Sequence, residues 1–159
     1  AYARICGFAE SDALPLPYPH VLAFPLTMRL MTGRTFPLPV LGLVHTWIEI
    51  TPHRAVRPAE PLELAVYAEG LTPHRRGTEV TMVTEARVGG ELVWESRSGY
   101  LSRHRTMDAA ATPRAASAPD AAGELPAVAE WALPGDLGRR YGAVSGDRNP
   151  IHLHPLTAR

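Results

Sequence analysis

The chain has 159 residues, a formal net charge of zero from 16 Lys+Arg and 16 Asp+Glu, and a hydrophobic fraction of 45%. This balance excludes the basic excess typical of nucleic-acid-binding proteins, and the apolar content excludes a disordered chain. No apolar run is long enough to cross a bilayer, and no basic-then-apolar leader opens the chain. We therefore expect a cytoplasmic, globular protein that contacts neither nucleic acid nor membrane.

The composition divides the chain into three zones. Residues 1–105 are expected to form a folded domain, and residues 106–126 an Ala/Pro-rich linker with almost no large apolar side chain to anchor it. Order resumes at residue 127, but residues 127–159 are too few to fold alone without disulfides or a metal. We therefore interpret them as the start of a second, incomplete domain.

The sequence pattern of the first zone predicts one buried helix. Residues 19–32 are apolar on all sides except at Arg29, a pattern typical of a helix that is buried all round. Gly33 is a plausible C-terminal stop. Pro25 either kinks this helix or is its first residue.

Four strand candidates follow this helix. Alternation of apolar and polar residues, with β-branched and aromatic side chains, predicts half-buried antiparallel strands. Gly89-Gly90 predicts a tight hairpin between two of them. A sheet wrapped around one central helix satisfies this order, which is an α+β layout whose best-known form is the hot-dog fold. The predicted strands are 41–50, 62–69, 79–88 and 91–103.

The chemistry is concentrated near the end of the chain, where residues 141–152 read Tyr-Gly-Ala-Val-Ser-Gly-Asp-Arg-Asn-Pro-Ile-His. Residues 137–144 predict a short helix, and Gly146 supplies its left-handed exit. The Asn-Pro pair stiffens the loop that follows. Such a bend allows Asp147 and His152 to face one small space, where they could hold a water and move protons in both directions. A purely structural interpretation, with capping and turn residues, is also open.

The string Ser145-Gly146-Asp147-x-Asn149-Pro-Ile-His152 closely resembles the hydratase signature of the MaoC-like dehydratases, the R-specific enoyl-CoA hydratases. Segments 19–26 and 42–45 also look like parts of the two-hot-dog members of this family. The resemblance implies that Asp147 and His152 are catalytic and that Asn149, Gly146 and Ser145 position their loop. It further implies a double hot-dog, whose first unit shapes an acyl-chain tunnel and whose second carries catalysis.

An internal comparison points the same way. Residues 2–7 align with residues 141–146, each with an aromatic residue, small residues, a β-branched residue and a final Gly. Phe8 stands where the second copy has Asp147. We interpret the chain as a tandem duplication whose first copy lacks the acidic residue.

The resemblance implies reversible addition of water to a trans-2-enoyl thioester in fatty-acid or polyketide-type metabolism. Its substrate is an acyl-CoA or acyl-carrier-protein thioester, without a cofactor, and by analogy a homodimer or paired hot-dog units are expected. In the family, backbone N–H groups of the catalytic half hold the thioester oxygen. These would lie beyond Arg159, so we expect the 159 residues alone to be inactive. A non-catalytic hot-dog subunit that binds acyl thioesters or supports an active homologue, and a hot-dog thioesterase, remain alternatives.

Other candidate residues favour structural interpretations. His20 and His45 lie in apolar surroundings and are interpreted as core or loop histidines, and Cys6, the only cysteine, as a buried small residue. The two ligands of a His-x-His at 152–154 do not make a metal site, so no metal is expected. Arg75-Arg76 could meet a coenzyme A phosphate but favours a solvated turn. Trp47 and Trp94 are expected in the core.

Overall fold

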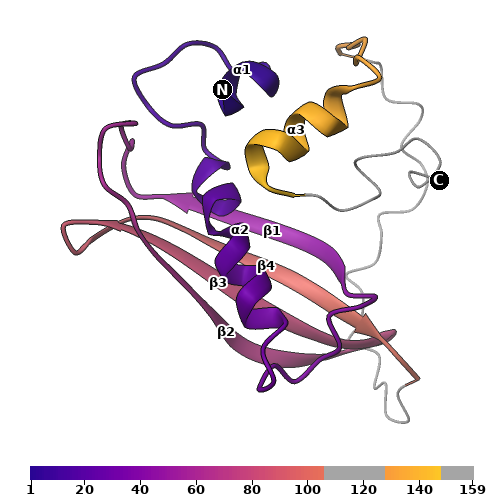
Figure 1. Cartoon of the computed structure of the whole chain (residues 1–159). Coiled ribbons are helices and arrows are strands. Elements are labelled where there is room, and N and C mark those ends of the chain that lie inside the picture. The colour runs from indigo at the N-terminus through magenta and orange to yellow at the C-terminus, as the bar shows by residue number, and fades with distance from the viewer. Residues whose placement is uncertain (106–127, 148–159) are drawn as a thin grey trace.

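The computed structural model describes residues 1–105 and 128–147. One long helix and four strands make up most of the first range, with a short helix near each end of the described chain (Figure 1). The predicted linker, 106–126, lies outside the described residues. In chain order the elements are α1 (Tyr2–Ile5), α2 (Tyr18–Met31), β1 (Val44–Pro52), β2 (Glu63–His74), β3 (Gly77–Val88), β4 (Glu91–Arg103) and α3 (Leu137–Ser145).

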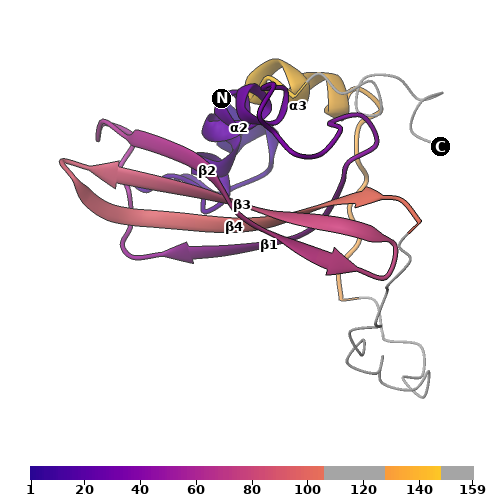
Figure 2. The ribbon, with the colours of Figure 1, turned by 90° about the horizontal axis from the view of Figure 1, so that it is seen from below.

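The four strands form one antiparallel sheet in the order β1-β4-β3-β2. The first and last strands of the chain are therefore neighbours, while β2 and β3 complete the sheet on the other side of β4. All three helices lie on one face of this sheet (Figure 2). The predicted α+β arrangement, a helix against an antiparallel sheet, is confirmed.

One of the two core clusters lies between α2 and the sheet. Ala23, Thr27 and Met31 recur every four residues along α2 and are all buried, because this spacing places them on one side of a helix. Met31 belongs to one core cluster with Val80 and Met82 of β3, which are 1% and 2% exposed. Strand alternation thus supplies the apolar surface that holds the helix in place.

The opposite side of α2 differs from the prediction. Leu22 and Leu26 are 39% and 40% exposed, so the expectation of a helix buried all round is wrong for the described residues. The physical reason is that a single sheet covers only one side of a helix. Pro25 lies inside α2 and is not its first residue, at the cost of one backbone hydrogen bond.

The hairpins follow the predicted turn chemistry, with one difference in length. Gly89 and Gly90 have φ of 56° and 83°, the left-handed pair that a tight two-residue hairpin requires. The strand predicted at 62–69 continues to His74, because a register shift between Ala68 and Gly70 lets the pairing with β3 resume.

The face of the sheet away from the helices is polar. Arg97 lies 3.2 Å from both Glu69 and Glu95, and the Tyr67 hydroxyl donates to Glu85 at 3.0 Å. Each exposed ion pair or hydrogen bond of this kind contributes little to stability. Together these side chains make this face of the sheet polar. In the part of the chain that the structure describes, no helix combines the length and the apolar character that a membrane span requires.

Candidate functional site

A cavity of about 240 Å³ lies where the end of α3 meets α2, β1 and β4. Asp147 is the one acidic side chain among the described residues that line it. The motif of the predicted second unit therefore faces the helix and the sheet of the first unit. The lining residues are His20, Val21 and Phe24 of α2, His45 and Ile48 of β1, Tyr100 of β4, and Tyr141, Ser145 and Asp147 of α3 and the residues after it.

The end of α3 determines where Asp147 lies. Gly146 ends the helix with φ of 75°, in the left-handed region that favours glycine. The Ser145 hydroxyl donates to the Tyr141 carbonyl at 2.9 Å, and the Asp147 N–H donates to the Ser145 hydroxyl at 3.1 Å. These bonds close the bend directly after the helix, with Asp147 half-buried on the cavity wall.

Two of the predicted site residues, Asn149 and His152, lie outside the described residues. The pairing of His152 with Asp147 therefore stays a prediction. Of the residues singled out in the motif, the structure brings Ser145 and Asp147 to the cavity and gives Gly146 the predicted backbone conformation.

Opposite α3, three rings line up along the cavity wall. His45 and Tyr100 are direct partners across β1 and β4, and their rings stack with centroids 4.7 Å apart and planes within 11°. The His20 ring is nearly parallel to that of His45, with centroids 6.2 Å apart. Its Nδ1 lies 3.3 Å from the Ser96 hydroxyl, which ties α2 to β4. The rings are therefore fixed by two strands and one helix.

A β-bulge is the reason that His45 faces the cavity. Pairing of β1 with β4 matches His45 to Tyr100 and Trp47 to Gly99, so Thr46 is the extra residue. In a regular strand, His45 and Trp47 would share one face. An extra residue reverses the facing of the chain on one side of it.

The side chains around the bulge follow this reversal. His45 and Ile48 both line the cavity, although they are an odd number of residues apart. Thr46 Oγ1 and Trp47 Nε1 both donate to the Glu79 carboxylate, at 2.7 Å and 2.9 Å. The Glu79 carboxylate therefore anchors the bulge from the polar face of the sheet.

The charge states of the cavity are set by burial and by Asp147. Burial lowers the pKa of His20, and the neighbouring His45 lowers it further; burial also lowers the pKa of His45. Burial, followed by the charge of Asp147, raises the pKa of Tyr100 and of Tyr141. At neutral pH the imidazoles are therefore neutral and the phenols protonated, so the cavity presents hydrogen-bond donors and one carboxylate.

Two histidines that were expected in the core or in loops both line the cavity of Asp147. His20 is half-buried on α2 beside Ser96, whereas His45 is exposed on β1, so the expectation is wrong for His45. The signal available for His45 was a lone imidazole in an otherwise apolar strand segment. For His20 the signal was an imidazole near the start of an apolar helix, close to the point where a second segment can pack.

Other interpretations are corrected or confirmed by the structure. Cys6 is exposed rather than buried, because it follows the last residue of α1 and only Tyr2 of that short helix is buried. Trp94 is 2% exposed, as expected for a core residue, but Trp47 is 39% exposed because the bulge turns it to the polar face. Residues 75–76 form the turn between β2 and β3. The His-x-His at 152–154 lies outside the described residues, so the expectation of no metal stays a prediction. Among the residues that the structure describes, no group of three His, Cys, Asp or Glu side chains could hold a metal.

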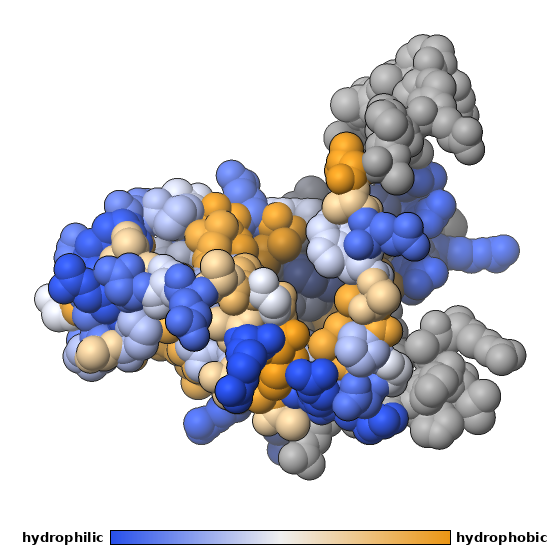
Figure 3. All heavy atoms as spheres, turned by 90° about the horizontal axis from the view of Figure 1, so that it is seen from above, coloured by the Kyte–Doolittle hydropathy of each residue, from blue (hydrophilic) through white to orange (hydrophobic). Residues whose placement is uncertain are grey.

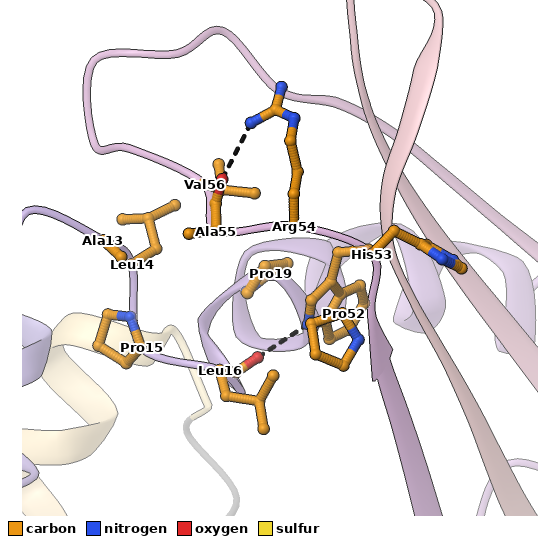
Figure 4. A pocket seen from close by; sticks show the side chains of 11 residues that line it. Ala13, Leu14, Pro15, Leu16, Pro19, Pro52, His53, Arg54, Ala55 and Val56 are labelled. Atoms are coloured by element: carbon orange, nitrogen blue, oxygen red, sulfur yellow. Dashed lines mark hydrogen bonds between the residues drawn. The ribbon is translucent and has the colours of Figure 1, made fainter.

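A second cavity, of about 320 Å³, lies between the end of β1 and the segment before α2 (Figure 4). Arg54 lines it but is already bound to Glu60 at 2.9 Å and Glu91 at 3.3 Å. Figure 4 shows its guanidinium directed to the Ala55 carbonyl, at 3.0 Å. A guanidinium with its donors used in this way does not offer a phosphate site, so we assign no function to this cavity.

The internal sequence repeat corresponds to two helices in contact. α1 and α3 pack against each other, and each is followed by a glycine of almost equal conformation, Gly7 with φ of 73° and Gly146 with φ of 75°. The first aromatic residue of one segment, Tyr2, lies against its counterpart Tyr141, with ring centroids 6.3 Å apart. The two aligned segments therefore share local structure as well as sequence.

Comparison with known proteins adds a relative over the whole chain. No protein-family model matches the chain. It is 36% identical over 160 residues to 3-hydroxyacyl-thioester dehydratase X of Mycobacterium tuberculosis, an alignment that covers 100% of this chain and 56% of that protein. Two crystal structures of HtdX from Mycobacterium tuberculosis superpose on the chain with a TM-score of 0.76, at 34% and 36% identity. They cover 99% of this chain, which spans 59% and 62% of theirs.

These matches confirm the hot-dog fold and the resemblance to dehydratases that residues 141–152 indicated. The chain is a relative of 3-hydroxyacyl-thioester dehydratase X and spans little more than half of that protein's length.

Proposed function

We propose that the complete natural protein containing this chain is a 3-hydroxyacyl-thioester dehydratase, which acts in reverse as an (R)-specific 2-enoyl-CoA hydratase. The observation that supports this most is the position of Asp147, which the end of α3 holds on the wall of a cavity. The 36% identity to a protein of that name supports the same reaction. The stereochemistry follows from the resemblance of residues 145–152 to the R-specific signature.

The reaction needs proton transfer and the cleavage of one C–O bond, with no overall change of oxidation state. In dehydration, the C2–H and C3–O bonds of the 3-hydroxyacyl thioester break, a C2=C3 double bond forms and one water leaves. The atoms balance without an oxidant or a reductant, and we propose no cofactor. Asp147 and His152 hold the water and move the proton between it and C2, while Asn149, Gly146 and Ser145 position their loop.

The substrate class follows from the same family. We propose that the acyl group arrives as a thioester of coenzyme A or of an acyl carrier protein, in cytoplasmic fatty-acid or polyketide-type metabolism. We also propose that a second hot-dog unit, in the same natural chain or in a partner subunit, packs on the first. The apolar side chains that the described residues leave exposed on α2, Leu22 and Leu26, support such a partner.

The test is hydration of crotonyl-CoA by the complete natural protein, followed by the loss of enoyl-thioester absorbance. Asp147→Asn and His152→Ala should each lower kcat by about 100-fold or more, the usual contribution of a positioned acid or base. Release of free thiol from acyl-CoA is measured in parallel, since that product would identify a thioesterase instead.

Asp136→Asn is the matched control. Asp136 precedes α3 at its other end and makes no side-chain cap bond, so this variant should retain wild-type turnover. Full activity of both Asp147→Asn and His152→Ala would remove the dyad from the mechanism. Binding of acyl-CoA without turnover in the wild type would point to a non-catalytic subunit.

A further inference from the structure

We propose that Tyr100 is a substrate-contacting residue of this site, which donates a hydrogen bond to the oxygen on C3, and that His45 is the positioning residue that holds its ring. The inference rests on the proposed function and deepens it. The oxygen on C3 is the leaving hydroxyl in dehydration and the attacking water in hydration, so one donor serves both directions.

The first argument for this role is the position of Tyr100 in the cavity. Tyr100 and Asp147 line the same cavity of about 240 Å³ from different elements, one on β4 and the other after α3. The charge of Asp147 also contributes to the raised pKa of Tyr100, behind the larger effect of burial, which is consistent with a phenol close to that carboxylate. A protonated phenol and a carboxylate thus line one space that is large enough for a small polar group.

The chemistry of the reacting oxygen fits this pair. A hydroxyl group or a water donates to one neighbour and accepts from another. Asp147 offers an acceptor, and Tyr100 offers a donor that stays protonated because its pKa is raised. Tyr141 also lines the cavity, and Asp147 raises its pKa as well. Tyr100 differs in that its ring is stacked on a direct cross-strand partner, whereas the ring of Tyr141 has a tilted contact with Tyr2 at 6.3 Å.

The rigidity of the Tyr100 ring comes from β1. His45 stacks on it with centroids 4.7 Å apart and planes within 11°, and the two residues are direct cross-strand partners. This stacking requires the bulge at Thr46, without which the His45 side chain would face away from the cavity. A fixed ring keeps the hydroxyl in place before the substrate arrives, which avoids an ordering cost during the reaction.

The first experiment compares Tyr100→Phe with the wild type in the complete natural protein, in both directions. In hydration, kcat should fall about tenfold or more, the loss expected for one hydrogen bond in a charged site, while KM for crotonyl-CoA stays within about twofold. In dehydration, KM for 3-hydroxybutyryl-CoA should rise, because that substrate carries the contacted hydroxyl. A structural defect would not produce this difference between directions. Tyr67→Phe is the control, since Tyr67 lies on the polar face and is 41% exposed.

The second experiment tests the stacking. His45→Ala should lower kcat for hydration about tenfold, and His45→Phe, which retains an aromatic ring against Tyr100, should restore most of it. His53→Ala, an exposed histidine beyond the cavity, should match the wild type. If both His45 variants behave alike, the positioning role of His45 is wrong.

The outcomes of these experiments distinguish a failure of the role of Tyr100 from a failure of the proposed dehydratase function. An active wild type with inactive Asp147→Asn and a fully active Tyr100→Phe overturns the role of Tyr100 alone. A wild type that neither hydrates crotonyl-CoA nor dehydrates 3-hydroxybutyryl-CoA overturns both proposals. A lower thermal midpoint together with the same split between kcat and KM in both directions would make Tyr100 a packing residue and would also overturn the inference.

Discussion

At the scale of single residues, His20 links cavity chemistry to folding stability. Its ring lies 3.3 Å from the Ser96 hydroxyl, and burial followed by His45 lowers its pKa below the ordinary value. The unfolded chain therefore binds this proton more readily than the folded one, and stability is lost as the pH falls below the unfolded pKa of about 6.5. The midpoint of thermal unfolding should therefore decrease as the pH falls below about 6.5.

His20→Asn should flatten this decrease while it keeps a polar group near Ser96. His74→Asn serves as the control, because His74 lies in the turn between β2 and β3 and accepts from the Arg76 N–H at 3.1 Å, a bond that Asn can replace. The measurement is the unfolding midpoint of each variant across the pH range. Parallel curves for the wild type and His20→Asn would contradict the prediction.

Some residues of the site could be predicted from the sequence and others could not. Ser145, Gly146 and Asp147 were predictable because a helix end followed by a left-handed glycine is a local feature. His45 was not, since period two assigns it to the face of Trp47, and one extra residue in the pairing of β1 with β4 reverses that assignment. A bulge depends on the partner strand, which the local sequence does not specify.

At the scale of elements, α3 sets the direction of Asp147 through its last turn. Gly146 has φ of 75° and open space where a Cβ would lie, so the cost of another residue there is backbone strain alone. Gly146→Ala should destabilise this helix end by about 1 kcal/mol and lower the kcat/KM of the complete natural protein several-fold. Gly146→Asn should cost less, because Asn tolerates the left-handed region.

The same helix region supplies the control for this prediction. Gly135 precedes α3, has open space around it and has no left-handed φ, so Gly135→Ala should leave kcat/KM and the unfolding midpoint unchanged. Equal activity of Gly146→Ala and Gly135→Ala would mean that the helix end does not position Asp147.

The type of each element, helix or strand, was easier to predict from the sequence than the order in which the strands pair. Alternation predicted all four strands and the glycine pair predicted their hairpin, because both signals lie within a few residues. The pairing of β1 with β4 joins segments that are far apart in the chain, and the pattern of either strand alone does not specify it. The apolar character of α2 was correctly identified, but its outer side is uncovered by the described residues.

At the scale of the whole molecule, the described residues leave several large apolar side chains exposed. Seen from above, hydrophobic side chains gather in the middle of the face, between polar margins (Figure 3). Leu26 is 40% exposed, and Trp131 and Leu133 before α3 are 76% and 71% exposed. Large apolar side chains exposed to this extent are the kind of surface that a partner covers, and they support the second unit over α2 that we propose.

Leu26→Gln in the complete natural protein tests this expectation. If a second unit covers α2, the substitution buries an amide in an apolar contact and should cost about 2 kcal/mol or more in the free energy of unfolding. If Leu26 stays as exposed as it is among the described residues, the cost should be about 1 kcal/mol at most. Denaturant unfolding of Leu26→Gln beside Leu41→Gln, whose side chain is 89% exposed, measures the difference. Near-equal costs for the two variants would leave α2 uncovered in the whole protein, and the paired hot-dog arrangement would lose its support.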